Sequence, residues 1–365
     1  MTREIRLAGS GELGAHCAPR DDGATPDWPG LLATLRREGT PKRVFGFEHG
    51  IAGTVQAEIA RRYRLWEDLD ERAPDASIRR TVAVHRFLRL ELVRIFPTGG
   101  RIVAPKREGA WAEQRCGPVA TREGLERFPW PDPNAADLTC MDQFQALAPD
   151  TMRAFHVLDI WEVVRDLMGF EQLCFALYED PDLVRDVFER VGGFAEAVAE
   201  RLCAYPAFGA VYLADDLGHK TGLMIHPEQI REFVLPWHRR MARLAHRHGK
   251  LLLFHSCGDM YELIDDYIDD VGIDAKHSFE DVVLPVTEAK ARYGDRLSLL
   301  GGIDVDFLAR ATPEAIARHT RDVLDACQPG GGYCLGSGNW VTDYIPVDNY
   351  LAMLAAARQW PAEGA

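Results

Sequence analysis

The 365-residue chain is 47% hydrophobic and 27% charged, as is usual for a globular protein. Its 56 acidic and 42 basic residues give a net charge of −14, which repels nucleic acid and anionic membranes. No window approaches the roughly 20 consecutive apolar residues of a membrane helix, and the first residues contain no apolar signal core. We therefore expect a cytoplasmic protein that binds neither nucleic acid nor membranes.

The eight cysteines are scattered without the spacing of a disulfide framework. In a reducing compartment such residues are free thiols or metal ligands. Only Cys257 and Cys334 stand where a predicted strand ends, so these two are the candidates for a functional role.

Predicted strands and helices alternate along the chain from residue 43 onward. Short apolar runs closed by glycine or polar residues predict strands at 43–47, 153–158, 210–214, 250–254, 273–276, 297–300 and 332–335. Helical spacing and capping residues predict helices at 51–63, 77–95, 161–177, from 181, 227–249, 260–269, 284–293, 312–327 and 346–360. A stretch rich in Gly, Pro and Trp at 97–138 is expected to add strands or a hairpin.

This alternation predicts a parallel sheet with crossover helices. An open doubly wound sheet would carry a G-x-G-x-x-G turn after a strand, and the sequence has none. We therefore predict an α/β fold, a single (β/α)8 TIM barrel. It has an N-terminal extension and an insertion near residues 97–138. Residues 1–30 are expected to be a flexible tail and residues 31–365 the barrel.

In such a barrel the active site lies at the carboxyl ends of the strands. Because loops are polar in any protein, a single polar residue there carries little weight, whereas several on one mouth indicate a site. Polar or thiol side chains follow most of the predicted strands: Glu48, His49, Asp215, Asp216, His255, Cys257, His277, Glu280, Asp304, Cys334 and Asn339.

The stretch KLLLFHSCGD at 250–259 is the strand end with the most specific signal, because it carries two types of metal ligand. His255 and Cys257 are two residues apart, so on a strand their side chains point to the same face. Imidazole and thiolate are ligands of zinc, for which Cys334 is a third candidate and Glu280 a displaceable fourth. The alternative is two buried thiols and a hydrogen-bonded core histidine, and spacing alone does not decide between them.

His-Ser-Cys-Gly at 255–258, the distant Cys334 and GGIDVDFLARATPEAI at 301–316, read together, resemble the uroporphyrinogen decarboxylase superfamily. The resemblance covers most of the chain and is strongest from 161 to 360, and it implies a single (β/α)8 barrel. The segments that carry it further are FALYEDPDLV, ADDLGHKTGLMIHPEQIREFVLPWHRRM, FHSCGDM and YIPVDNYLAML.

The superfamily has two branches. Its decarboxylases hold the acidic porphyrinogen with an N-terminal R-Q-A-G-R motif. Residues 45–49, FGFEH, offer no arginine, and Glu48 would repel such a substrate. A decarboxylase-type lyase acting on a tetrapyrrole or another carboxylate is therefore the second hypothesis.

The other branch contains the methylcobalamin:coenzyme M methyltransferases and the corrinoid-protein methyltransferases of O-demethylase systems. The resemblance implies their zinc ligands, H-x-C…C, at His255, Cys257 and Cys334, and an acidic residue near the metal at Glu280. It implies a zinc-dependent transfer of a methyl group between a small methyl donor or thiol and a cobalamin. A separate corrinoid protein would carry that cobalamin as the partner.

The remaining strand-end residues receive roles from this hypothesis. Asp215, Asp216 and His277 would position the substrate or move a proton. Four further residues are expected to line the substrate pocket: Glu48, His49, Asp304 and Asn339. A homodimer is compatible with the sequence.

Overall fold

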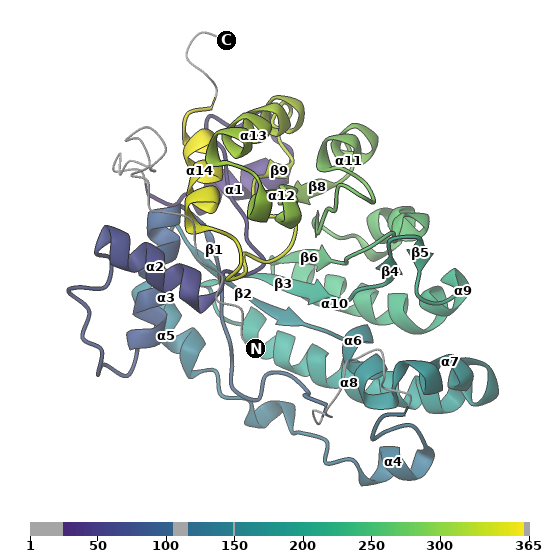
Figure 1. Ribbon diagram of the computed structural model, residues 1–365. Helices are drawn as coiled ribbons and strands as arrows, with labels where there is room; N and C mark the ends of the chain where they lie inside the picture. The colour runs from purple at the N-terminus through teal and green to yellow at the C-terminus, as the bar shows by residue number, and fades with distance from the viewer. Residues whose placement is uncertain (1–24, 105–115, 149, 361–365) are drawn as a thin grey trace, which may run out of the picture.

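Seven parallel strands form the central sheet of the computed structural model, which describes residues 25–104, 116–148 and 150–360. The helices surround this curved sheet (Figure 1). In spatial order its strands are β1 (Leu92–Arg94), β2 (Arg153–Leu158), β3 (Phe208–Ala214), β6 (Leu251–His255), β7 (Ala275–His277), β8 (Ser298–Leu300) and β9 (Tyr333–Cys334). A separate antiparallel hairpin consists of β4 (Gly218–His219) and β5 (Gly222–Leu223).

The strands are apolar runs because both of their faces are buried. In β6, Leu252 and Phe254 pack in the large core shared with the helices, whereas Leu251 and Leu253 pack in a second cluster inside the curve of the sheet. A strand covered on both faces reads as a continuous hydrophobic run. By the same alternation His255 points inward with Leu251 and Leu253.

The sheet curls so that its two ends face a common interior. Residues 45–47 join β9 through a parallel bridge at Gly46 and Leu335, and the Phe47 amide donates to the Leu335 carbonyl at 2.9 Å. The Phe47 ring lies 5.6 Å from that of Phe155 on β2 and 5.8 Å from that of Tyr212 on β3. The predicted α/β class and parallel sheet are therefore confirmed, as seven strands with residues 45–47 bridged to the last of them.

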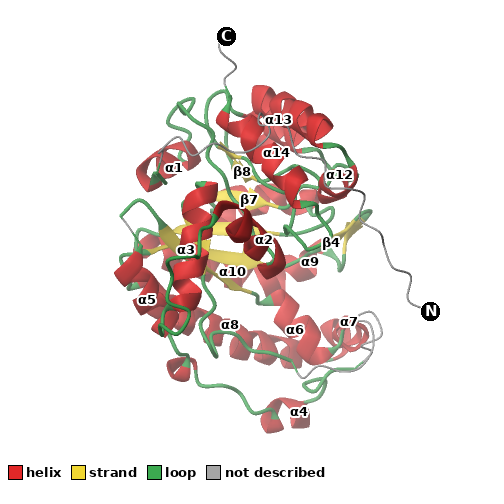
Figure 2. Cartoon of the chain, turned by 60° about the vertical axis from the view of Figure 1, so that its left-hand side comes forward, coloured by secondary structure: helices red, strands yellow, loops and turns green. Residues whose placement is uncertain are grey.

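Helices cover the outside of the sheet in Figure 2. Several begin at polar caps; for example, Asp180 accepts from the Leu183 amide at 3.0 Å, and Thr312 accepts from the Ala315 amide at 3.3 Å. The helices are α1 (Trp28–Leu35), α2 (Gly53–Tyr63), α3 (Ala76–Leu88), α4 (Arg122–Arg127), α5 (Thr139–Leu147), α6 (Trp161–Met168), α7 (Phe170–Glu179), α8 (Pro181–Cys203), α9 (Pro227–Gln229), α10 (Leu235–Arg247), α11 (Val286–Tyr293), α12 (Val305–Arg310), α13 (Pro313–Cys327) and α14 (Val347–Arg358).

Four predicted helices differ from the structure. The helix expected over 227–249 is divided into α9 and α10 by a π-helix at Ile230–Val234. The helix expected over 77–95 ends at Leu88, where Arg89 takes a left-handed φ of 61°, and β1 follows. Apolar and charged residues mix from 87 to 95 with no glycine or proline between them, so the sequence gives no signal of this change from helix to strand. Gly169, with φ of 81°, separates α6 from α7 within the helix expected at 161–177. The helix expected at 260–269 is a 3-10 turn followed by a π-helix at Asp266–Val271.

The stretch at 97–138 contains α4 and a short 3-10 turn, and an antiparallel bridge between Thr98 and Asp137 joins its two ends. The strands or hairpin expected there are not present in its described residues, and 105–115 lie outside them. Most of the tail expected at 1–30 also lies outside the described residues, but α1 already begins at Trp28.

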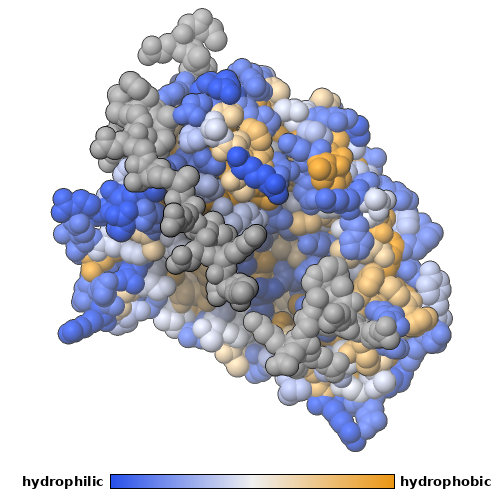
Figure 3. All heavy atoms as spheres, viewed as in Figure 1, coloured by the Kyte–Doolittle hydropathy of each residue, from blue (hydrophilic) through white to orange (hydrophobic). Residues whose placement is uncertain are grey.

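On the face shown in Figure 3, hydrophobic residues form small separate patches among hydrophilic ones. Within the described part of the chain, no helix combines the length and apolarity needed to cross a membrane.

Candidate functional site

An imidazole, a thiol and a carboxylate meet where β3 and β6 end. Cys257 Sγ and Asp216 Oδ1 lie 3.4 Å and 3.6 Å from His255 Nε2, and the Cys257 amide donates to Asp216 Oδ1 at 2.8 Å. The pairing of Ala214 with His255 brings the two strand ends side by side. One ligand atom from each of the three residues lies within 4.8 Å of the other two. We call Asp216, His255 and Cys257 the donor triad.

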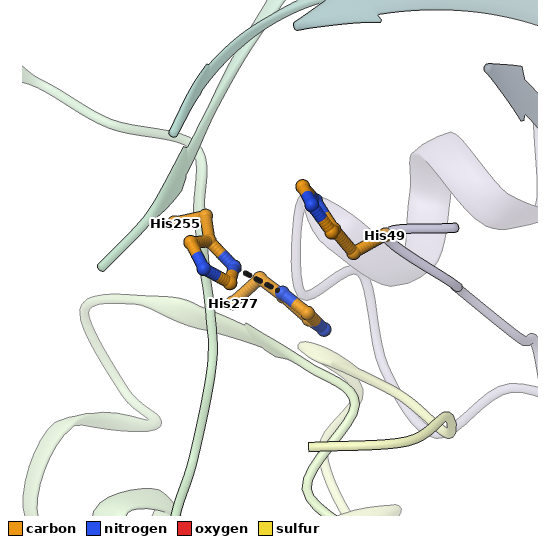
Figure 4. Close-up of side chains that lie close together, drawn as sticks. All are labelled: His49, His255 and His277. Carbon is orange, nitrogen blue, oxygen red and sulfur yellow. Dashed lines mark hydrogen bonds between the residues drawn. The ribbon is translucent and has the colours of Figure 1, made fainter. Parts of the chain in front are cut away.

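The hydrogen bonds of His277 set the tautomer of His255. His277 Nε2 lies 3.3 Å from the Ser337 carbonyl, which only accepts, so Nε2 carries the proton and Nδ1 is an acceptor. His255 Nδ1 lies 2.8 Å from this acceptor and must donate to it (Figure 4). The lone pair of His255 is then on Nε2, facing Cys257 and Asp216. This is the arrangement of a metal-ligating histidine held by a second residue.

Two further rings complete this layer. The Tyr212 hydroxyl lies 3.0 Å from Nδ1 of His49 and 3.0 Å from Nδ1 of His277. The His49 and His255 rings stack at 4.7 Å. Burial lowers the pKa of His255 to about 3 and that of His277 well below its ordinary value. The buried imidazoles are therefore neutral at neutral pH, as metal ligands must be.

His49, His255 and His277 also place ligand atoms within 4.8 Å of one another. Their rings are stacked, with interplanar angles of 23° and 18° from His49 to the other two. Two of their nitrogens already share a hydrogen bond. Lone pairs of stacked rings do not converge on one point, so the donor triad is the better metal site.

The Cys257 sulfur is surrounded by donors. Asn339 Nδ2 donates to it at 3.2 Å and Ser278 Oγ at 3.5 Å. Burial and the nearby charge of Asp216 nevertheless raise the pKa of the thiol to about 12. Without a cation the sulfur stays protonated, whereas a bound metal would take it as thiolate. The residues present therefore fit a zinc ion: a neutral imidazole, a thiol with donors around it, and a carboxylate.

Lys276 holds the backbone around this sulfur. Its buried Nζ donates to the carbonyls of Ser256 at 3.3 Å, His277 at 3.2 Å and Ser278 at 2.8 Å. Ser278 has a φ of 77°, a strained conformation for a residue other than glycine. Burial lowers the pKa of Lys276 to about 8. No sequence motif marks this lysine, whose only signal is a charge at the end of a predicted strand.

Two cavities lie beside the donor triad. One, of about 430 Å³, is lined by Asp216, Cys257 and Glu280 among others. The other, of about 920 Å³, is lined by Asp304 and Asn339. Glu280 and Lys220 line both, and the Gly258 amide donates to Glu280 Oε1 at 3.1 Å. Glu280 is thus the acidic side chain between the triad and the larger cavity.

Cys334 is the main correction to the predicted metal site. It is fully buried on β9, packed in the inner cluster with Phe47 and Leu300, and is not grouped with His255 and Cys257 among the described ligand atoms. Strands β7 and β8 lie between β6 and β9, and adjacent strands are about 4.8 Å apart. Asn339, beyond the end of the same strand, reaches Cys257 instead.

Three other predicted residues hold the scaffold. Buried Asp215 accepts from the amides of Ile160 and Glu162 at 3.0 Å and lies 2.7 Å from His238 Nε2, so it fixes the start of α6. It has no free oxygen for substrate, contrary to its predicted catalytic role.

Glu48 and Asp304 also bind backbone. Glu48 accepts from the Ser337 hydroxyl at 2.5 Å and from its amide at 3.1 Å, and burial raises the pKa of Glu48 to about 8. Asp304 accepts from the Asp306 amide at 2.7 Å as the cap of α12, while it lines the larger cavity. Glu48 therefore anchors the loop after β9. Asp304 lines the larger cavity, where the sequence placed it, as well as capping α12.

The comparisons with known proteins agree with this architecture. The family model of uroporphyrinogen decarboxylase (URO-D) matches residues 160–360, more than half of the chain, and the chain belongs to this family. A methyltransferase from Methanosarcina mazei of known structure is 16% identical, with a TM-score of 0.62 over 92% of this chain and 98% of that one. At this identity the likeness concerns the fold.

Two curated relatives are named for different activities. The methylated-thiol–coenzyme M methyltransferase of Methanosarcina mazei is 30% identical over 200 residues, 54% of this chain and 51% of that protein. The uroporphyrinogen decarboxylase of Alkalilimnicola ehrlichii is 28% identical over 192 residues, 50% of this chain and 48% of that protein. The matched part thus spans about half the length of each of these relatives.

Proposed function

We propose that this protein is a zinc-dependent methyltransferase that moves a methyl group between a small donor or thiol and a corrinoid protein. The observation that carries the proposal is the donor triad at the carboxyl ends of adjacent strands, next to two cavities. The relative that acts on methylated thiols supports it. The proposal includes a closed (β/α)8 barrel at 31–365, after an N-terminal extension, with the segment near 97–138 as its insertion.

In this proposal His255 Nε2, Cys257 Sγ and Asp216 hold the zinc, and Glu280 is the fourth, displaceable ligand. Asn339 and Ser278 donate to the sulfur and so fix its direction. His277 keeps the His255 lone pair on Nε2. A bound zinc would lower the pKa of a thiol or polarise a methyl donor.

The chain's own residues would then position the substrate and take up its proton. Glu280 lines both cavities, so its carboxylate would be placed to take up the proton of a thiol substrate. Asp216 is bound to the Cys257 amide and keeps its orientation. His277 lies behind His255, away from the cavities, and acts as a positioning residue. The corrinoid would approach over the open strand ends.

Methyl transfer from free methylcobalamin to a thiol tests this function. The zinc-loaded protein and 3-mercaptopropionate should convert methylcobalamin to cob(I)alamin, followed by its absorption spectrum. Cys257→Ser should abolish the conversion, and Cys334→Ser, the matched control, should retain it. A zinc-loaded protein that demethylates no cobalamin with this or a neutral thiol would contradict the proposal.

A further inference from the structure

Glu48 lies outside the donor triad, but its carboxyl holds the loop after β9 that contacts the triad. Its Oε1 accepts from the Ser337 amide at 3.1 Å, and its Oε2 lies 2.5 Å from the Ser337 hydroxyl. Glu48 is 4% exposed and Ser337 is fully buried. Both oxygens of one buried carboxyl therefore bind a single residue of this loop.

Ser337 connects that carboxyl to the site by two routes. Its carbonyl lies 3.3 Å from His277 Nε2, and His277 in turn accepts from His255 Nδ1 at 2.8 Å. Its hydroxyl lies 3.2 Å from the carbonyl of Asn339, whose side-chain Nδ2 donates to Cys257 Sγ at 3.2 Å. The position of Ser337 thus affects both the imidazole and the thiol of the donor triad.

Backbone contacts on the other side of the loop also hold it in place. A Cβ at Gly336 would lie 1.9 Å from the Phe47 carbonyl oxygen, and one at Gly338 would lie 2.4 Å from that of Phe279. The two glycines also form hydrogen bonds with the backbone of Ile303, at 3.0 Å and 2.6 Å. A change at the buried carboxyl should therefore alter hydrogen bonds within the loop and leave the course of its backbone.

The Ser337 hydroxyl has one hydrogen and two acceptors within reach, Glu48 Oε2 and the Asn339 carbonyl. A protonated Glu48 donates to the hydroxyl oxygen, so the hydroxyl hydrogen goes to the Asn339 carbonyl. An ionised Glu48 is the stronger acceptor, because hydrogen bonds to a charged group are stronger than neutral ones. The hydroxyl then turns to Glu48 and releases the Asn339 carbonyl. Burial raises the pKa of Glu48 to about 8, so both forms occur near neutral pH.

The other ionisable side chains around Glu48 are tyrosines. Tyr350 on α14 lies next to its carboxyl, and Tyr333 on β9 and Tyr212 on β3 are affected by its charge. Burial raises the pKa of all three hydroxyls well above the ordinary value, so they stay neutral where Glu48 ionises. Among these four groups, Glu48 is the one whose charge changes near pH 8.

We propose that Glu48 is a positioning residue: through Ser337 it holds the loop whose hydrogen bonds orient the imidazole and the thiol of the donor triad. The neutral carboxyl keeps both routes intact, and the ionised carboxylate loosens the one through Asn339. The effect on zinc affinity rests on the proposed function. The hydrogen bonds themselves are a property of the metal-free protein.

Nuclear magnetic resonance of the metal-free protein tests the coupling without a metal. The side-chain amide signal of Asn339, assigned by its absence in Asn339→Ala, should shift with pH with a midpoint near 8 in the wild type. In Glu48→Gln, which resembles the protonated form at every pH, this shift should vanish. A wild-type signal that does not titrate, or one that titrates alike in Glu48→Gln, would overturn the inference.

Zinc affinity near neutral pH, measured by competition with a chelator, is the second readout. Glu48→Ala should bind zinc about 10-fold more weakly, the usual effect of losing such a supporting contact, and Glu48→Gln should restore the affinity. Glu91→Ala is the matched control, because Glu91 is equally buried and pairs with Arg43 away from the site. Equal affinity in Glu48→Ala and the wild type would contradict the positioning role.

A further variant and a comparison of the two readouts keep the two proposals separable. If circular dichroism shows that Glu48→Ala does not fold, Ser337→Ala removes the hydroxyl instead, and the Asn339 signal should then no longer titrate. A protein that binds no zinc but shows the Glu48-dependent titration would reject the methyltransferase and keep the positioning role. Zinc binding without that titration would reject the positioning role alone.

Discussion

The Nδ1 atoms of His255 and His277 lie 2.8 Å apart, and the Ser337 carbonyl at the far side of His277 decides which of them carries the proton. Because His277 donates to the Ser337 carbonyl and accepts from His255 Nδ1, the lone pair of His255 is on Nε2, beside Cys257 and Asp216. A backbone carbonyl after β9 thus determines the ligand chemistry at the end of β6, three strands away across the sheet.

Removing His277 should weaken metal binding without removing a ligand. In His277→Phe nothing accepts the His255 Nδ1 proton, so the tautomer and the ring orientation are no longer fixed. We expect zinc affinity to fall by about 10- to 100-fold, the usual effect of losing such a partner. Competition with a chelator measures it, with His85→Phe, another buried histidine, as the control. Unchanged affinity in His277→Phe would show that His255 needs no partner.

The two adjacent aspartates should have separable effects. Asp215→Asn weakens the cap of α6 and its contact with His238, and we expect it to lower the free energy of unfolding by about 1–3 kcal/mol while zinc binding persists. Asp216→Asn should do the reverse, with stability nearly unchanged and zinc affinity reduced. Urea unfolding and zinc titration of both variants measure the two effects. The opposite pattern would make Asp215 a functional residue, the role that the sequence predicted for both aspartates.

Glu48 should make the protein less stable as the pH rises. Burial raises its pKa from 4.5 to about 8, so between these values the folded state keeps a proton that the unfolded state has released. This contribution is complete below about pH 4.5 and is lost as the pH rises toward about 8. Glu48→Gln removes it, so the stability of the variant relative to wild type should increase over this range, by at most about 1.4 kcal/mol per pH unit.

Urea unfolding at several pH values measures the Glu48 effect, with Glu67→Gln as the surface control. Glu67 is 52% exposed, so its variant should follow the wild type at every pH. A stability difference between Glu48→Gln and wild type that does not change with pH would contradict the assignment of a proton to Glu48.

Lys276 should matter for both folding and the metal. Lys276→Met fills a similar space but leaves three carbonyls without their donor. A buried carbonyl that loses its hydrogen-bond donor costs about 1–3 kcal/mol. We expect a lower melting temperature and, because the backbone around Cys257 loosens, weaker zinc binding. Lys42→Met, at an exposed lysine, should change neither. A stable Lys276→Met with full zinc affinity would show that the Ser278 strain is held by other contacts.

The sequence predicted the parts of the site that follow from strand geometry. Alternation along a strand predicted His255 and Cys257 on one face. Asp216 was expected at the same mouth with a catalytic role, and the structure places its carboxylate within ligand distance of both. Alternation does not say how deep in the interior a residue lies, so Cys334 was expected at the mouth although it packs among inner apolar side chains.

Contacts between side chains of different strands could not be predicted from the sequence. Tyr212 and Lys276 belong to no motif, since each contacts groups on a neighbouring strand or beyond its end, such as His277 for Tyr212 and the Ser256 carbonyl for Lys276. Asp215 and Asp216 are adjacent residues of the same type, so the sequence does not distinguish them. In the structure Asp215 binds the backbone where α6 begins, whereas Asp216 binds the Cys257 amide and is a candidate ligand. Such distinctions need the folded chain.

Zinc content of the purified protein tests the donor triad most directly. We predict about one zinc per wild-type chain, lost in His255→Ala and Cys257→Ala, weakened in Asp216→Ala and retained in Cys334→Ala. Loss in Cys334→Ala with full retention in Asp216→Ala would place the metal elsewhere than at the donor triad. A wild-type protein that carries no zinc, and binds none when it is added back, would contradict the account as a whole.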